Sequence, residues 1–513
     1  MKANQLKWGS TLSYLQMALN IIIGLCYTPI MIKLLGSSEY GLYNTVSSTI
    51  SILSVLSLGF GSGYIRYYAK YKAAGDKESI FRLNGLFLVI FSIIGLVALA
   101  CGLFLSGNLQ LVFDKGLTTE EYKIARVLML LLTVNLAVSF PASVFSHIIS
   151  AHERYIFLKL LGAVRTVLSP LVTLPLLLMG FRSIAMVTVS VVLHIAVDAI
   201  YFFYVVFVIN DKFLFGRVDR ELFTSLFAYT AFIAINMIVD QVNTNFGKII
   251  LGRYKGTSAV SVYSVGYTLY SFYLMFSNSI STVFTPRIHK IVIETSEHER
   301  KQKLTDLFTT VGRIQFLVLA LVSSGLIFFG KTFITRYWAG SVYGDAYYVA
   351  LLLIIPSTIP LIQNLGIEIQ RAQNKHRFRS LAYAVMAVVN LGLSVVLCQK
   401  FGAVGAAIGT AFSLILANGV IINIYYHKQC NIDILAFWKS ILSMLPGLIP
   451  CAALGIVLNA FVTYNSFVKF ALCILLYAAV YCISMWFISM NDYEKSLIII
   501  PANKTLGKLR HKK

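Results

Sequence analysis

Two segments of the chain carry rows of polar side chains within otherwise apolar sequence. In residues 222–250 the polar positions recur every three or four residues, so they share one face of a helix. This row consists of Asn236, Asp240, Asn243, Thr244, Gly247 and Lys248. A similar row in residues 10–33 consists of Ser13, Gln16, Asn20, Gly24 and Thr28. Amides and ionisable groups arranged in this way can bind a polar molecule or an ion.

The apolar surroundings limit where these rows can lie. A charged side chain at the depth of a bilayer costs roughly 2.5–3.5 kcal/mol, so the rows must face a bundle interior or a water-filled cavity. A seam of hydrogen bonds between helices is the alternative. The cavity is favoured because Asp240 and Lys248 are ionisable and lie about two helical turns apart, too far for direct neutralisation.

Two more ionisable groups lie within apolar segments. Asp198 is in the middle of residues 184–209, and Arg165 is about two turns inside residues 157–180. A structural ion pair between neighbouring helices is the favoured interpretation. The alternative is a carboxylate that takes up and releases a proton during transport, a role that Asp240 could also fill.

The composition places all of these groups in a membrane protein. The 513 residues are 58% hydrophobic and 12% charged, whereas soluble domains are about a quarter charged. Apolar runs of about twenty residues recur along the whole chain, each long enough to cross a bilayer. We therefore predict an all-α polytopic membrane protein with fourteen spans rather than a β-barrel. The spans are expected at 10–33, 40–63, 83–106, 124–148, 157–180, 184–209, 222–250, 260–284, 314–338, 347–370, 380–399, 403–426, 437–459 and 467–489.

The net charge of +22 reflects topology rather than nucleic-acid binding. Predicted loops on the side of the N-terminus hold more than twice as many Lys and Arg residues as the opposite loops. The positive-inside rule then places both termini in the cytoplasm, where the basic residues contact anionic lipids. The seven cysteines contain no CxxC pair, and nothing in the sequence predicts a metal or a cofactor.

The second half repeats the first in outline at an offset of about 220 residues. Aligned positions are Gly36 with Gly256, Ala151–Phe157 with Ala372–Phe378, Gly180 with Gly402, Tyr204 with Tyr426, Gln16 with Asn236 and Asn20 with Asp240. The polar rows are thus duplicated as well. Duplicated membrane bundles are typical of transporters, because alternating access rocks one repeat against the other.

This repeat predicts five parts. They are a six-helix bundle (1–210), a charged cytoplasmic linker (211–221), a second six-helix bundle (222–428), an extra helix pair (429–490) and a basic cytoplasmic tail (491–513). Breaks are predicted at the prolines, with Pro29 and the Pro356/Pro360 pair as candidate hinges, and at the glycine-rich stretch Gly59–Gly63. That stretch lacks the strand and the lysine of a phosphate loop, so nucleotide binding is not expected.

Three stretches resemble a known family. Residues 35–43 (LGSSEYGLY) resemble the LG-x-x-E-[YF]-G-x-[YF] signature of polysaccharide flippases, which belong to the multidrug/oligosaccharidyl-lipid/polysaccharide exporter superfamily. Residues 151–155 and 402–410 are also similar to that family, as is the layout of six, six and two spans. The resemblance implies a V-shaped pair of bundles that exports a polyprenyl-diphosphate-linked oligosaccharide across the inner membrane, with H⁺ or Na⁺ coupling in some members and a polysaccharide polymerase as a candidate partner.

The polar residues are compatible with such a substrate. Lys248 and Arg165 could attract the diphosphate, while Gln16, Asn20, Asn236 and Asn243 could hydrogen-bond sugar hydroxyls. Because the row holds few cations, Arg66 and Arg287, at nearly repeat-related positions, are alternative contacts where the headgroup enters.

Two other functions remain open at this stage. A multidrug or cation antiporter of the same superfamily would favour several acidic and aromatic cavity residues, but the rows are rich in amides. Among membrane enzymes, a lipid-linked-sugar transferase would need paired carboxylates on an outer loop, and a polymerase usually has a large outer loop. An acyltransferase would need a membrane-buried histidine near an asparagine, and His194 alone does not meet that requirement. No loop is long, so we do not expect an enzyme.

Overall fold

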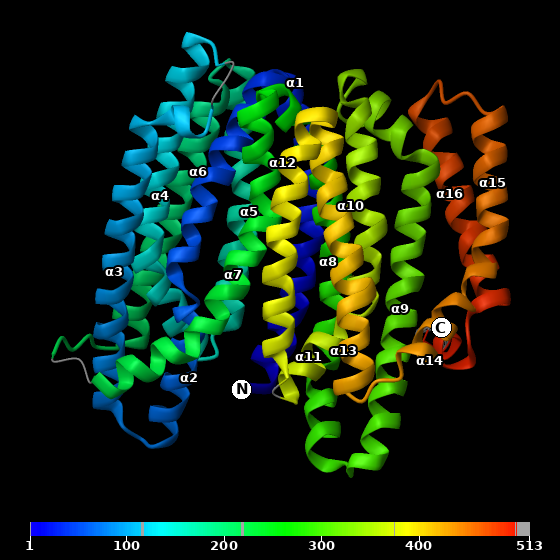
Figure 1. The fold of residues 1–513 in the computed structure, drawn as a ribbon. Helices are drawn as coiled ribbons and strands as arrows, with labels where there is room; N and C mark the ends of the chain where they lie inside the picture. The colour runs from blue at the N-terminus through cyan, green and yellow to red at the C-terminus, as the bar shows by residue number, and fades with distance from the viewer. Residues whose placement is uncertain (1, 114–116, 217–219, 374, 498, 500–513) are drawn as a thin grey trace, which may run out of the picture. The chain divides into compact units, whose positions relative to one another are not determined.

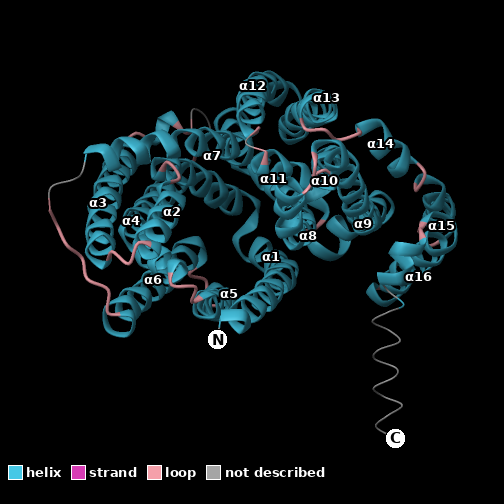
Figure 2. Ribbon diagram, turned by 90° about the horizontal axis from the view of Figure 1, so that it is seen from below, coloured by secondary structure: helices cyan, strands magenta, loops and turns pink. Residues whose placement is uncertain are grey.

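The computed structural model describes residues 2–113, 117–216, 220–373, 375–497 and 499. Every regular element within these residues is helical, as Figures 1 and 2 show. This confirms the predicted all-α class. The basic residues Lys504, Lys508, Arg510, Lys512 and Lys513 of the predicted tail, and Arg217 and Asp219 of the linker, lie outside the described residues.

The chain forms two compact units. Unit 1 comprises residues 1–266 and 383–413, and unit 2 comprises residues 267–382 and 414–513. Unit 1 contains α1 (Lys2–Ile52), η1 (Leu53–Ser57), α2 (Phe60–Ala73), α3 (Lys77–Gly107), η2 (Leu109–Leu111), α4 (Thr119–Ala151), α5 (Tyr155–Leu178), α6 (Arg182–Phe203), η3 (Tyr204–Ile209) and α7 (Arg220–Lys255). The residues of α8 (Thr257–Glu294) and α12 (His376–Leu414) are shared between the units.

Unit 2 contains the remaining helices. They are α9 (Glu297–Thr332), η4 (Phe333–Trp338), η5 (Ser341–Tyr343), α10 (Gly344–Ile362), α11 (Leu365–Ala372), η6 (Ile415–Ile421), α13 (Ile422–Gln429), α14 (Ile434–Leu442), η7 (Leu445–Leu448), α15 (Ile449–Phe461), α16 (Phe467–Ser484) and η8 (Met485–Ser489). These units and the repeats inferred from the sequence are different divisions of the chain, since each unit contains parts of the second repeat.

The helical layout agrees with the predicted spans. Ten helical stretches of the described chain are long and apolar enough to cross a membrane. Two of them, Thr11–Ala73 and Arg377–Gln429, each cover two predicted spans. The long helices α7 and α8 coincide with the predicted spans 222–250 and 260–284.

Polar caps and helix breakers set where the helices begin and end. The Asp76 carboxylate accepts from the amide of Ser79 at the start of α3, and Thr118 and Glu121 form a capping box at the start of α4. The break predicted near Gly59–Gly63 lies at Leu58 and Gly59, both with positive φ. Pro29 lies inside α1, whereas α10 ends at Ile362, two residues after Pro360.

Left-handed residues recur at repeat-related positions. Gly36 and Gly256 have φ of 78° and 82°, and Gly180 and Gly402 have φ of 88° and 57°. Asn210 and Asn431, each just after the last helix of its repeat, have φ of 60° and 55°. Glycine and asparagine tolerate this conformation best, so these positions mark the same chain reversals in both repeats.

An aromatic stack recurs in the same way. Phe157 of α5 stacks on Tyr204 of η3 with centroids 4.0 Å apart, and Phe378 of α12 stacks on Tyr425 of α13 at 4.3 Å. The sequence alignment paired Tyr204 with Tyr426, but the stack shows that Tyr425 is its structural counterpart.

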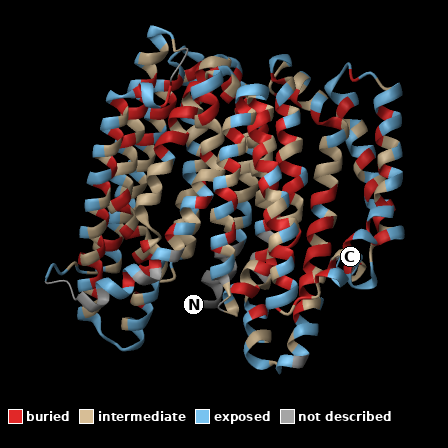
Figure 3. Ribbon diagram, in the orientation of Figure 1, coloured by how far each residue is buried: buried red, intermediate tan, exposed pale blue. Residues whose placement is uncertain are grey.

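The helices of unit 1 pack closely along one another. Extensive contacts join α3 to α4, α4 to α6, and α1 to both α5 and α7. A Cβ atom at Gly95 would lie 2.6 Å from the carbonyl oxygen of Ala137, so glycine permits the close approach of α3 and α4. In unit 2, α10 packs along α9. Half of the membrane-spanning part of α10 is buried, whereas about a tenth of that part is buried in α5 and in α6 of unit 1 (Figure 3).

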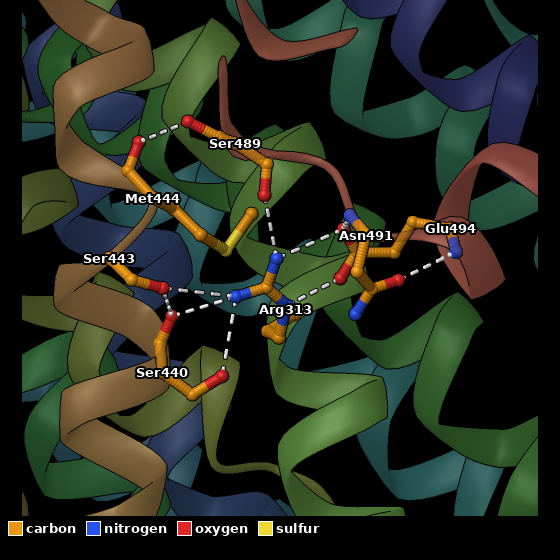
Figure 4. A network of polar contacts seen from close by, with 7 residues as sticks. All are labelled: Arg313, Ser440, Ser443, Met444, Ser489, Asn491 and Glu494. Atoms are coloured by element: carbon orange, nitrogen blue, oxygen red, sulfur yellow. Dashed lines mark hydrogen bonds and ion pairs between the residues drawn. The ribbon is translucent and has the colours of Figure 1, made fainter. Parts of the chain in front are cut away.

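A buried ion pair fixes the C-terminal helices within unit 2. Arg313 of α9 donates to Glu494, to the carbonyl oxygen of Ser489 and to the carbonyl oxygen of Ser440 in α14 (Figure 4). The Arg313 and Glu494 side chains are 8% and 1% exposed. The guanidinium therefore links α9 both to α14 and to the chain after η8.

Candidate functional site

The polar row of the seventh predicted span lies on α7 in unit 1. Asn236, Asn243 and Lys248 are half-buried, and Asp240 is exposed. Lys248 lies two turns beyond Asp240 on the same helix. The row thus combines two opposite charges with amides along one helix face.

Asn243 contacts a polar cluster on α12. Its Oδ1 accepts from Nδ2 of Asn390 at 2.9 Å. Asn390 Oδ1 in turn accepts from Ser394 at 3.0 Å and from Thr410 at 3.3 Å. The sequence analysis did not single out these α12 residues, although Asn390 and Ser394 are spaced four apart and therefore share a helix face.

A second polar face of α7 was also missed. Gln241 Nε2 donates to Ser54 Oγ at 3.0 Å, and Asn245 Nδ2 donates to Gln241 Oε1 at 2.5 Å. The first bond joins α7 to η1, next to α1, and the second lies within α7. The helix therefore carries both arrangements that the sequence left open, because Gln241 and Asn245 form a hydrogen-bonded seam beside the row that holds Asp240 and Lys248.

The polar row of the first span lies on α1. A Cβ atom at Gly162 would lie 2.8 Å from Nε2 of Gln16, which places this amide against α5. Asn20 is half-buried, and Thr28 is buried. α1 and α7 pack together at Thr45 and Gly252, because a Cβ atom at Gly252 would lie 2.8 Å from the methyl group of Thr45.

Asp198 and Arg165 belong to a cluster formed by α4, α5 and α6. Arg165 acts electrostatically on Asp198 and on His194. Nδ1 of His194 is 3.0 Å from Oδ1 of Asn135 on α4. The sequence analysis did not place this histidine and asparagine near Asp198, and an ion pair between Arg165 and Asp198 stays a prediction.

The two arginines expected to meet the headgroup are both exposed. Arg66 lies on α2 in unit 1, and Arg287 lies on α8 in unit 2. Each lies in the part of its helix that follows a predicted span, at 40–63 and 260–284 respectively. Their side chains are therefore accessible to a charged molecule.

The motif in residues 36–43 has a structural explanation. Glu39 is buried and accepts from the amide and hydroxyl of Ser183, at the start of α6, at 2.9 Å and 2.5 Å. Arg182 lies 3.3 Å from the same carboxylate. A carboxylate at this position satisfies free amides at the helix N-terminus and interacts favourably with its dipole.

The motif also meets its own repeat. Ser38 and Thr257 share a hydrogen bond of 2.8 Å. A Cβ atom at Gly41 would lie 1.8 Å from the carbonyl oxygen of Thr257, so a glycine is required there. The two copies of the repeated segment therefore touch within unit 1.

The fold matches known transporters. A lipid II flippase, MurJ in an inward-closed conformation, superimposes with a TM-score of 0.71 at 17% identity over 96% of this chain and 99% of that chain. A multidrug resistance MATE transporter in an inward-facing conformation gives 0.61 at 14% identity over 82% and 99%. A transporter of the same superfamily from Pyrococcus furiosus gives 0.60 at 13% identity over 85% and 96%.

Two proteins and one family are also related to this chain by sequence. Agl15 of Haloferax volcanii, assigned as a probable flippase of low-salt glycan biosynthesis, is 25% identical over 37% of this chain and 39% of its own length. A Shigella flexneri protein assigned as an O-antigen transporter is 20% identical over 78% of this chain and 92% of its own length. The family described as Polysaccharide biosynthesis protein matches residues 8–292. That match covers more than half of the sequence, and the chain belongs to this family.

Proposed function

We propose that this protein is a flippase that carries polyprenyl-diphosphate-linked oligosaccharide units across the cytoplasmic membrane by alternating access, for cell-surface polysaccharide synthesis. The observation that carries the proposal is the ionisable and amide-rich row on α7 within a duplicated membrane fold. A protein with long apolar helices has little reason to place Asp240 and Lys248 within one of them unless they serve a polar cargo or ion. Its family membership and the flippase assignments of its relatives support the same function.

The substrate has three chemically distinct parts. Lys248, with Arg165 as a second candidate, attracts the anionic diphosphate. Gln16, Asn20, Asn236 and Asn243 offer amide groups to sugar hydroxyls, and the polyprenyl tail stays in the lipid. Exposed Arg66 and Arg287 meet the headgroup where it enters.

Ion coupling would reset the transporter after release. Asp198 is the candidate proton or sodium carrier, since Arg165 can compensate its charge within the same cluster. Asp240 is the second candidate. Replacing Asp198 by Asn should remove the dependence of transport on the ion gradient while preserving insertion into the membrane; transport still driven by that gradient would reject this role.

The proposed setting follows from charge and topology. The protein lies in the inner membrane with both termini in the cytoplasm, where its basic residues contact anionic lipids. A polysaccharide polymerase is the proposed partner, since the exported units must be joined outside. The protein itself moves its substrate and makes or breaks no covalent bond in it.

Cells depleted of the protein provide the main test. Outer-leaflet labelling of lipid-linked oligosaccharide would be compared with the total pool. Accumulation on the cytoplasmic side, with synthesis intact, supports flipping and identifies the glycan. Normal outward labelling in cells without a redundant flippase rejects it and favours the cation antiporter.

Variants on α7 test the site. Asp240→Asn and Lys248→Ala should each lower outward labelling at least tenfold, because one charge–phosphate or charge–ion contact of about 1.5–3 kcal/mol is lost. Lys400→Ala, at an exposed position of α12, is the matched control. Full activity of both α7 variants, at normal membrane levels, would reject the assignment of this row.

A further inference from the structure

The linker between the repeats does not extend into solvent directly after η3, the last helix of the first repeat. Leu214 N donates to the carbonyl oxygen of Phe81 on α3 at 3.0 Å, and Asn84 Nδ2 donates to the carbonyl oxygen of Lys212 at 3.2 Å. A Cβ atom at Gly85 would lie 2.2 Å from the carbonyl oxygen of Leu214. The first part of the linker, residues 211–214, is therefore docked against α3.

An ionisable pair lies at the start of this docked segment. Asp211 Oδ1 is 3.8 Å from Nε2 of His152, just after α4, and the two side chains are only 12% and 25% exposed. Asn84 Nδ2 also approaches Asp211 Oδ2, at 3.5 Å. The pair thus joins the linker to α4 in addition to its backbone contacts with α3.

The second repeat docks its own segment without such a pair. At the offset of 221 set by Asn210 and Asn431, Gln373 stands in place of His152 and Ile432 in place of Asp211. Gln373 Nε2 donates to the carbonyl oxygen of Cys430 at 3.3 Å, and Asp433 N donates to Thr305 Oγ1 at 3.0 Å. Ile432 is fully buried. Docking therefore needs no titratable pair, and the one in the first repeat calls for another explanation.

The hydrogen bonds around His152 determine which of its ring nitrogens can take up a proton. Nδ1 lies 3.0 Å from the carbonyl oxygen of Ile148 and donates to it, which leaves Nε2 to accept from Tyr68 Oη at 3.1 Å. Protonation of Nε2 therefore adds a positive charge on the ring edge that faces Asp211. Histidine is the side chain whose charge ordinarily changes between pH 5 and 8.

We propose that Asp211 and His152 form a proton-responsive clamp that holds residues 211–214 against α3 and α4 more firmly as pH falls. The other charged or titratable groups facing the pair come from α2 and from the loop after α4. They are Tyr64, Tyr68 and Lys72 of α2, and Glu153 of the loop. Among these groups and the pair itself, histidine is the side-chain type whose charge ordinarily changes between pH 5 and 8, so His152 is the proposed switch.

The direction of the effect follows from the surroundings of Asp211. Burial raises the pKa of Asp211 above its ordinary value, while His152, Asn84 and Lys72 act in the opposite direction. An ionised Asp211 is thus least favourable when His152 is neutral. A protonated His152 stabilises an ionised Asp211 in the docked state, so docking should strengthen as pH falls and weaken as pH rises.

Amide hydrogen exchange of the purified full-length protein tests the clamp. After correction for the intrinsic pH dependence of exchange, residues 211–214 should be about fivefold better protected at pH 5.5 than at pH 8, as expected for a partly exposed ion pair. Residues 432–435 of the second repeat are the internal control and should show no such change. Equal behaviour of the two segments in the wild-type protein would overturn the proposal without any variant.

The double variant His152→Gln/Asp211→Ile copies the pair of the second repeat into the first. It should keep the docked segment protected and remove the pH dependence. The single variant His152→Gln should remove the pH dependence as well. Persistence of the wild-type pH dependence in either variant would also overturn the proposal.

Discussion

The guanidinium of Arg313 and the carboxylate of Glu494 form a bidentate ion pair, although the two residues are 181 positions apart in the chain. Nε donates to Oε1 at 2.5 Å, and Nη2 donates to Oε2 at 3.1 Å. The remaining donors of Arg313 reach the carbonyl oxygens of Ser440 and Ser489, both at 2.8 Å. This one side chain therefore joins both α14 and the end of η8 to α9 in unit 2.

Breaking this pair should destabilise unit 2 strongly. Arg313→Met leaves a buried carboxylate without its partner, which costs about 3–5 kcal/mol. The double variant Arg313→Met/Glu494→Leu removes both charges and should recover most of that loss. Labelling of the buried thiol of Cys451 during detergent-induced unfolding would measure stability.

The exposed pair of Arg82 and Glu78 provides the control for this prediction. Their side chains are 66% and 65% exposed, so Arg82→Met should change stability little. If the double variant were as unstable as Arg313→Met, the carboxylate left unpaired would not be the cause.

Removal of the Glu39 carboxylate should weaken the start of α6. Glu39→Ala leaves the amide and hydroxyl of Ser183 without their acceptor, which corresponds to the loss of a helix cap, about 1–2 kcal/mol. Hydrogen exchange of residues 183–186 would show the fraying directly. Glu120→Ala, at an exposed position in the first turn of α4, is the control. Unchanged exchange in Glu39→Ala would contradict the capping role of the motif.

Gly41 should tolerate no side chain. An added Cβ atom would meet the carbonyl oxygen of Thr257 at 1.8 Å and the amide nitrogen of Ser261 at 3.2 Å, so α1 and α8 would have to separate. We expect Gly41→Ala to lower both the yield of folded protein and its thermal stability. A Cβ atom at Gly107 would have no neighbour within 4 Å, so Gly107→Ala is the matched control. Equal stability of the two variants would show that the contact between the repeated segments is dispensable.

The sequence predicted the helices because membrane spans need only apolar length, which is a local property. The repeat was also visible locally, since Gly36, Gly180 and their counterparts occupy left-handed positions that few residues tolerate. The alignment of Tyr204 was wrong by one residue because two adjacent tyrosines, Tyr425 and Tyr426, both fit it. Only the stacking on Phe378 distinguishes them.

The polar contacts were less predictable because they depend on helix rotation and on partners distant in sequence. Asn243 contacts Asn390, 147 residues away, and nothing near either residue specifies that pairing. Gln241 and Asn245 are four residues apart and could have been recognised as a second polar face of α7. The sequence analysis selected one polar row because it holds charged residues, and it therefore did not identify Gln241 and Asn245. Whether the row that holds Asp240 and Lys248 contacts substrate stays a prediction.

The bond between Asn243 and Asn390 offers a way to separate structure from substrate binding. A double-mutant cycle with Asn243→Leu and Asn390→Leu should give a coupling energy of about 0.6 kcal/mol, the average for polar contacts in membrane helices. If Asn243 also binds sugar hydroxyls, Asn243→Leu should lower outward labelling of lipid-linked oligosaccharide, per amount of folded protein, more than Asn390→Leu. Asn390→Leu also leaves the hydroxyls of Ser394 and Thr410 without their acceptor, so it should be the less stable of the two variants. Equal transport by both variants would assign Asn243 to the scaffold and remove it from the proposed substrate site.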